Sequence, residues 1–174
     1  MNEEIIWTKT ILKVYRYLER ISGAIDRLVL RCGLGSGSFN SQMFYQNNVL
    51  SISQKIINLS ERKVTLINLK VLTETILKKL KAEDAKILIE KYVDGRKYKD
   101  ICLRNQISLR TIYRRLDASE NAFARLLVAK GYSGQKLSQM LENENWILSV
   151  YNQLKEKNDD FDLSSSFLDR AVSM

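Results

Sequence analysis

Apolar residues recur at intervals of three and four along most of this chain, and no proline interrupts the pattern. This spacing places the apolar side chains on one face of an α-helix. Six of the seven glycines lie in residues 33–37, at position 95 and in residues 131–134, between the helical segments. No convincing strand-like alternation is present. We therefore expect an all-α fold.

The N-terminal part of the chain contains two long amphipathic segments, residues 3–31 and about 42–80, separated by a small, polar loop at residues 32–41. Polar residues at 60–63 interrupt the second segment, so it is either two helices or one bent helix. Neither apolar stripe can be buried by its own helix. We expect residues 1–80 to form a helical hairpin or coiled-coil-like segment, which serves as a scaffold, a homodimer contact or a contact for RNA polymerase.

Three further helices are predicted at residues 82–93, 98–104 and 108–130. The pair Asp94-Gly95 marks the first turn between them, and Asn105-Gln106-Ile107 marks the second. Two short helices that meet at a tight turn before a longer helix are the layout of a helix-turn-helix unit.

The C-terminal part is predicted to contain one more helix, at residues 134–157. Gly131 is expected to end the preceding helix, and Ser133 is expected to cap the last one. The acidic, serine-rich tail that follows is expected to be mobile. The chain therefore divides into four parts, residues 1–80, 81–131, 132–157 and 158–174.

The charge of the chain is unevenly distributed. The net charge is +8, of which residues 81–130 carry +5, whereas residues 158–174 carry −3. A concentrated excess of lysine and arginine attracts polyanions such as nucleic acid.

The sequence offers no recognisable catalytic or metal-binding pattern, although catalysis by paired carboxylates or lysines would not need one. The chain has no histidine and only two cysteines, Cys32 and Cys102, so it matches no known zinc-ligand pattern and cannot form a histidine-based triad. The glycines of residues 33–37 lack the lysine and the strand of a phosphate-binding loop. We expect a protein that is not an enzyme and that has no metal and no cofactor. The chain has no apolar run long enough to span a bilayer and no signal-peptide layout at its N-terminus, so we expect a cytoplasmic protein with no membrane contact.

The segment from Gly95 to Leu116 carries the features of a DNA-reading unit. Ser108 is placed to cap the helix that follows it, and the start of such a helix points into the major groove. The base-facing candidates are Leu109, Arg110, Tyr113 and Arg114. The phosphate-contacting candidates are Arg96, Lys97, Lys99, Arg104, Ser108, Thr111 and Arg115. The small core beneath them is predicted to contain Leu88, Tyr92, Ile101, Ile107, Ile112 and Leu116, with Cys102 as a small packing residue.

Two sequence stretches resemble the C-terminal, fourth region of bacterial sigma factors. These are KYKDIC at residues 97–102 and ISLRTIYRRL at residues 107–116, and the lead-in ILIEKYVDGRKY is also similar. The resemblance implies a domain that reads the upstream promoter element and touches RNA polymerase. Gln106 stands where that family usually has glycine. The layout of the whole chain resembles the small sigma-like regulators of phages and mobile elements, the ArpU-like group.

We therefore expect a sequence-specific DNA-binding transcription regulator of bacterial or phage-like origin, which binds double-stranded DNA. Two alternatives remain open. The first is a divergent sigma factor that recruits core RNA polymerase. The second is an adaptor or inhibitor that uses a helix-turn-helix fold to bind another protein. Neither the target site nor the sign of regulation follows from the sequence.

Overall fold

The protein is all-helical in a computed structural model, which describes residues 3–35 and 42–156. No strand is present in these ranges, so the predicted all-α class is confirmed. None of the helices in these ranges combines the length and apolar character needed to cross a membrane. In chain order the elements are α1 (Glu3–Gly35), α2 (Gln42–Lys79), α3 (Ala82–Leu88), the π-helical turn η2 (Ile89–Val93), α4 (Tyr98–Asn105), α5 (Leu109–Ala129), α6 (Gly134–Met140) and α7 (Asn145–Lys155).

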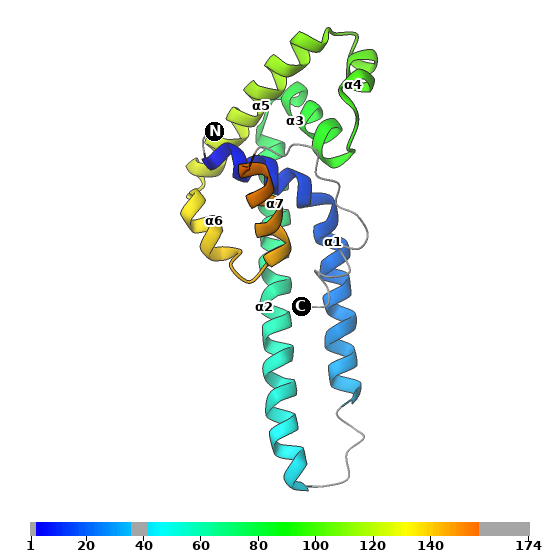
Figure 1. The fold of residues 1–174 in the computed structure, drawn as a ribbon, viewed down its shortest axis with the longest axis vertical. Helices are drawn as coiled ribbons and strands as arrows, with labels where there is room; N and C mark the ends of the chain where they lie inside the picture. Colours follow the sequence, from blue (N-terminus) through cyan, green and yellow to red (C-terminus); the bar gives the residue numbers. More distant parts are fainter. Residues whose placement is uncertain (1–2, 36–41, 157–174) are drawn as a thin grey trace.

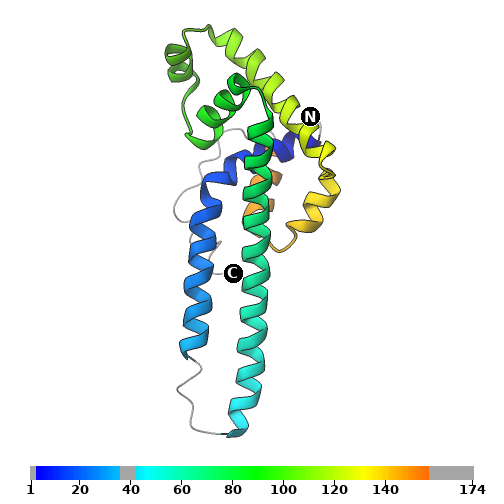
Figure 2. The same cartoon turned by 180° about the vertical axis from the view of Figure 1, so that it is seen from behind.

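Helices α1 and α2 lie side by side and run in opposite directions along the long axis of the molecule (Figures 1 and 2). Their apolar stripes are buried, including Leu18 and Ile25 on α1 and Leu66 and Leu69 on α2. Two ion pairs also join the helices beside this apolar contact, which we call the hairpin seam. Lys63 Nζ lies 2.6 Å from Asp26 Oδ1, and Lys70 Nζ lies 2.9 Å from Glu19 Oε2. The two helices form a hairpin.

The two long helices differ in detail from the expectation. Residues 32–35, predicted as loop, continue α1, while residues 36–41 lie outside the described ranges. The interruption expected at residues 60–63 does not break α2, which is one helix. Ser60 and Lys63 find polar partners while the helix continues, because the Ser60 hydroxyl donates to the Ile56 carbonyl and Lys63 forms an ion pair with Asp26 of α1.

The N-terminal half of α1 joins the hairpin to the rest of the molecule. It crosses the upper part of α2 (dark blue in Figure 1), and α1 also contacts α5, α6 and α7. Trp7 is completely buried there and stacks on Tyr151 of α7 with ring centroids 4.3 Å apart. Because these residues belong to the same apolar cluster as the hairpin seam, one core runs through the described helices.

The prediction of a single C-terminal helix over residues 134–157 is wrong. The chain forms α6 and α7 with a turn between them. At this turn Glu144 is almost completely buried, and its carboxylate accepts two hydrogen bonds from Arg62 of α2, at 2.9 and 3.2 Å. The same carboxylate accepts a 2.8 Å bond from the indole N–H of Trp146. These contacts fix the turn. The two predicted caps are correct, since Gly131 has φ +80° and the Ser133 hydroxyl accepts from the Lys136 amide. The predicted acidic tail lies outside the described residues.

A buried carboxyl lies between α1, η2 and α5. The Tyr92 hydroxyl donates to Glu120 Oε1 at 2.5 Å, and Lys9 Nζ lies 3.5 Å from Glu120 Oε2. Burial raises the pKa of Glu120 above its ordinary value, although the Tyr92 hydrogen bond and the charge of Lys9 act in the opposite direction. The folded state therefore favours the protonated carboxyl more than the unfolded chain does.

This raised pKa predicts how stability depends on pH at Glu120. The stability contributed by the protonated carboxyl is fully present below the unfolded pKa of about 4.3 and is lost as pH rises through the higher folded pKa. Glu120→Gln cannot ionise, so the variant lacks this loss. We expect the free energy of unfolding of Glu120→Gln, minus that of the unsubstituted protein, to increase with pH between the unfolded pKa and the higher folded pKa of Glu120. Urea denaturation at a series of pH values measures the difference. A difference that does not change with pH would show that the pKa is the same in both states.

Candidate nucleic-acid interface

Helices α4 and α5 form the upper end of the molecule in Figure 1, opposite the end at which α1 stops and α2 begins. A short turn joins them, and its first residue, Gln106, adopts the left-handed conformation with φ 52° and ψ 39°. Ser108 then caps α5, since its side-chain oxygen accepts from the Thr111 amide at 3.2 Å. The predicted cap at Ser108 is confirmed. The Ser108 and Thr111 side-chain oxygens are also 2.9 Å apart, which ties the first turn of α5 together.

A small apolar core holds α3, η2, α4 and α5 together. Ile101 and Ile112 are completely inaccessible, and Leu116 is buried beside them. Of the predicted core residues, Ile107 is only partly buried, and Cys102 is a partly buried free thiol. The remaining predicted core residues, Leu88 and Tyr92, are buried as expected.

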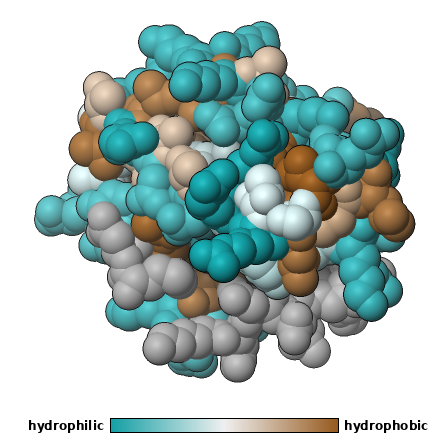
Figure 3. Space-filling view, turned by 90° about the horizontal axis from the view of Figure 1, so that it is seen from above, coloured by the Kyte–Doolittle hydropathy of each residue, from teal (hydrophilic) through white to brown (hydrophobic). Residues whose placement is uncertain are grey.

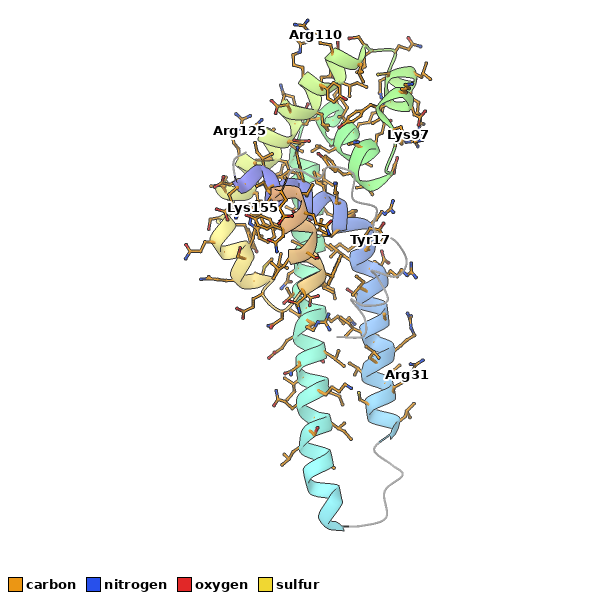
Figure 4. All side chains as sticks on the ribbon, in the orientation of Figure 1. Tyr17, Arg31, Lys97, Arg110, Arg125 and Lys155 are labelled. Atoms are coloured by element: carbon orange, nitrogen blue, oxygen red, sulfur yellow. The ribbon has the colours of Figure 1, made fainter. Side chains whose placement is uncertain are left out.

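The four predicted base-facing residues share the exposed side of the first two turns of α5. Leu109 is 46% exposed and Tyr113 is 50% exposed, and Arg110 and Arg114 are exposed as well. Arg110 extends away from the body of the molecule at its upper end (Figure 4). Seen from above, hydrophilic residues cover most of this end (Figure 3). The surface thus carries two guanidinium groups beside exposed apolar and aromatic groups.

The predicted phosphate-contacting residues fall into two groups. Lys97, Lys99, Arg104 and Ser108 are exposed on α4 and the adjoining turns, and Thr111 is partly buried by its contact with Ser108. Lys97 lies at the start of α4, well apart from Arg110 (Figure 4).

Two predicted cations have partners within the chain. Arg96 donates to Asp94 Oδ2 at 3.2 Å, and Arg115 lies 3.5 Å from Glu83 of α3. Both guanidinium groups are about two-fifths exposed or less, so they are less available to an added anion than the exposed lysines.

Two structural residues of this surface were not predicted from the sequence. The Asn105 side chain accepts from Lys86 Nζ at 2.7 Å and donates to Glu90 Oε2 at 2.8 Å, which links the end of α4 to α3 and η2. Tyr98 packs against Tyr113, with ring centroids 4.7 Å apart, and Lys91 Nζ lies 3.8 Å from the centre of the Tyr98 ring. Tyr113 therefore has a fixed neighbour on one side. The only sequence sign of this contact is the presence of one tyrosine in each helix.

The left-handed turn residue leads to a stability prediction. A non-glycine residue in this conformation costs about 1–2 kcal/mol, whereas glycine adopts it freely but loses more entropy on folding, about 0.5–1 kcal/mol. We expect Gln106→Gly to raise the free energy of unfolding by roughly 0.5–1 kcal/mol, and Gln106→Val to lower it, because a β-branched residue fits this conformation poorly. Urea denaturation of both variants measures the two changes. Equal stability of both variants would contradict the left-handed turn.

The described residues contain no cluster of three or more cysteine, aspartate or glutamate side chains that is suited to a metal ion. No protein-family model, curated protein or solved structure matches this chain. A functional assignment for the α4–α5 end therefore depends on its own residues.

Proposed function

We propose that this protein is a sequence-specific DNA-binding transcription regulator of the sigma-like type. In this proposal α4 and α5 act as a helix-turn-helix unit, and the start of α5 enters the major groove of promoter DNA. The supporting observation is the division of α5 into two sides. Leu109, Arg110, Tyr113 and Arg114 are exposed on the first turns, while Ile112 and Leu116 are buried against the rest of the unit.

The chemistry of this surface suits double-stranded DNA. An arginine can donate two hydrogen bonds to guanine, and an apolar side chain such as Leu109 can contact a thymine methyl group. Lys97, Lys99 and Arg104 are exposed cations on the adjoining helix α4 and at its start, and the free amides at the start of α5 also favour a phosphate. Contacts to phosphates supply affinity, whereas Arg110 and Arg114 are assigned to base recognition.

Selection from random DNA duplexes tests the proposal. The purified full chain is incubated with the duplexes at moderate salt, and the bound DNA is sequenced. Enrichment of one motif is expected, and a palindrome would indicate a symmetric dimer bound to two half-sites. Weak binding to all sequences that disappears with added salt would show phosphate contact without base reading. That result, or no binding, would overturn sequence-specific recognition by the free protein.

A second candidate function is binding of another protein through the same end. The observation that favours it is Leu103 on α4, which is 79% exposed, on the same end as the half-exposed Leu109. Core RNA polymerase is the partner that a divergent sigma factor would bind, and an adaptor would bind a different protein. Salt distinguishes these modes, because DNA affinity through several cations falls steeply as salt rises, whereas an apolar protein contact changes little. Stable co-purification with core polymerase would favour the sigma-factor alternative.

A further inference from the structure

Helix α2 has a second apolar side in addition to the one that packs in the core. Six of the thirteen exposed large apolar residues in the described ranges belong to α2, which is the largest share of any helix. Four of them are spaced seven residues apart, and each is at least 50% exposed. We call these four the outer stripe: Leu50, Ile57, Val64 and Val71.

The repeat of seven distinguishes the outer stripe from a helix face that packs on a globular core. Apolar residues at a strict interval of seven stay in line only when two helices wind around each other, because a straight helix turns the line by about 20° per repeat. The outer stripe keeps this interval through three repeats and extends for roughly 32 Å along α2, at 1.5 Å per residue. Ile67, which is 41% exposed, widens it. The spacing therefore fits another helix as the partner.

The surface of α2 also has a shallow, open depression at the middle of the outer stripe. The pocket there is lined by Ile56, Ile57, Ser60, Glu61, Val64 and Thr65. Four of these residues lie at positions i, i+3, i+4 and i+7, the arrangement that receives a side chain from a facing helix in a coiled coil. The small side chain of Ser60 leaves the space between Ile57 and Val64 open.

The charges beside the outer stripe bear on the identity of its partner. The exposed neighbours Ser53, Ser60 and Asn68 are uncharged, and Lys63 and Lys70 form ion pairs with α1. Glu61 is an exposed carboxylate beside the middle of the stripe, and the exposed Lys78 and Lys79 lie beyond its end at Val71. The Glu61 carboxylate would repel an acidic protein or a nucleic acid at the middle of the outer stripe. A second copy of this chain presents the same apolar line without exposed lysine or arginine beside its middle, and the repulsion between two chains of net charge +8 is weakest where the positive charge of each is low.

We infer that the outer stripe is the interface of a homodimer, in which the α2 helices of two copies pack against each other. A contact of this kind uses the same patch on both copies and closes around a two-fold axis. In Figures 1 and 2, α1 is the only described helix beside the lower length of α2. This interface would leave Arg110 at the far end exposed, and the inference holds whether or not that end binds DNA.

The test compares the mass of the full-length protein in solution with that of charge variants, by sedimentation equilibrium over the micromolar range. We expect the unsubstituted protein to have twice the monomer mass at the upper concentrations. Ile57→Glu combined with Val64→Glu is expected to be monomeric throughout, with unchanged helical circular dichroism. The matched control, Leu103→Glu combined with Val128→Glu, adds the same charges at exposed apolar positions of α4 and α5 and should remain dimeric.

A complementary pair of variants locates the contact. The variant with lysine at both positions, Ile57→Lys and Val64→Lys, should also be monomeric on its own. Mixed with the glutamate variant, it should form a heterodimer through opposite charges, in either orientation of the helices. The inference is overturned if the unsubstituted protein is monomeric, if the charge variants stay dimeric, or if the mixture remains monomeric.

Discussion

Replacing Arg110 and Arg114 together with alanine is expected to weaken binding to a selected DNA site by about 30-fold or more. Each arginine that donates two hydrogen bonds to a base contributes about 1–3 kcal/mol of discrimination, and 1.4 kcal/mol corresponds to a tenfold change in affinity. Both side chains are exposed on α5, so their removal should not disturb the buried residues beneath. Fluorescence anisotropy with the selected duplex and with a scrambled duplex, at one salt concentration, measures the change.

The control for this experiment removes the same charge elsewhere on α5. Arg125→Ala combined with Lys130→Ala takes away two exposed cations from the far part of the helix and its C-terminal cap (Figure 4). The control should lose affinity equally for both duplexes, through weaker long-range attraction only. The assignment of the reading face would be wrong if the two double variants bind the selected site equally well while both remain folded.

Removing the buried carboxylate at the α6–α7 turn is expected to have the largest effect on stability. Glu144→Ala deprives Arg62 of two hydrogen bonds and Trp146 of one, in a site where the Glu144 side chain is only 1% exposed and that of Arg62 13%. Breaking a buried ion pair by removing one partner typically costs about 3–5 kcal/mol. Urea denaturation should show a decrease of that order in the free energy of unfolding.

An exposed ion pair of the hairpin provides the comparison. Asp26→Ala breaks the pair with Lys63, in which the Asp26 side chain is 51% exposed, and should cost at most about 1 kcal/mol because water screens it. The loss in free energy of unfolding for Glu144→Gln should lie between those of Glu144→Ala and Asp26→Ala, since the amide oxygen can still accept a hydrogen bond from the Trp146 indole. A cost for Glu144→Ala no larger than for Asp26→Ala would mean that the turn does not depend on this contact.

The elements that local patterns determine were the ones predicted well. Ser108 and Ser133 cap their helices, Gly131 has the left-handed conformation expected beyond the end of α5, and Ile101 and Ile112 are buried. Each of these depends on residues within a few positions along the chain. The exposed positions of α5 were predicted for the same reason, because helical spacing determines which side faces the core.

Two of the features that were missed depend on residues far apart in the sequence. The turn before α7 depends on Arg62, which no local periodicity connects to Glu144. The partner of Arg115 is Glu83 on another helix, so its pairing within the chain was not foreseen. The outer stripe of α2 was overlooked because a single inward-facing stripe already accounted for most of the apolar residues in that helix.

The stacking of Trp7 on Tyr151 has a consequence for how the protein forms during synthesis. Helix α1 is synthesised before α5, α6 and α7, and it buries part of its apolar side against all three. Native contacts of such long sequence separation form late, since the loop between them must close first. Until α7 emerges, Trp7 and its neighbours on α1 lack their final partners. Between the synthesis of α1 and that of α7 the nascent chain is therefore vulnerable to aggregation, and the hairpin is the part that can assemble early.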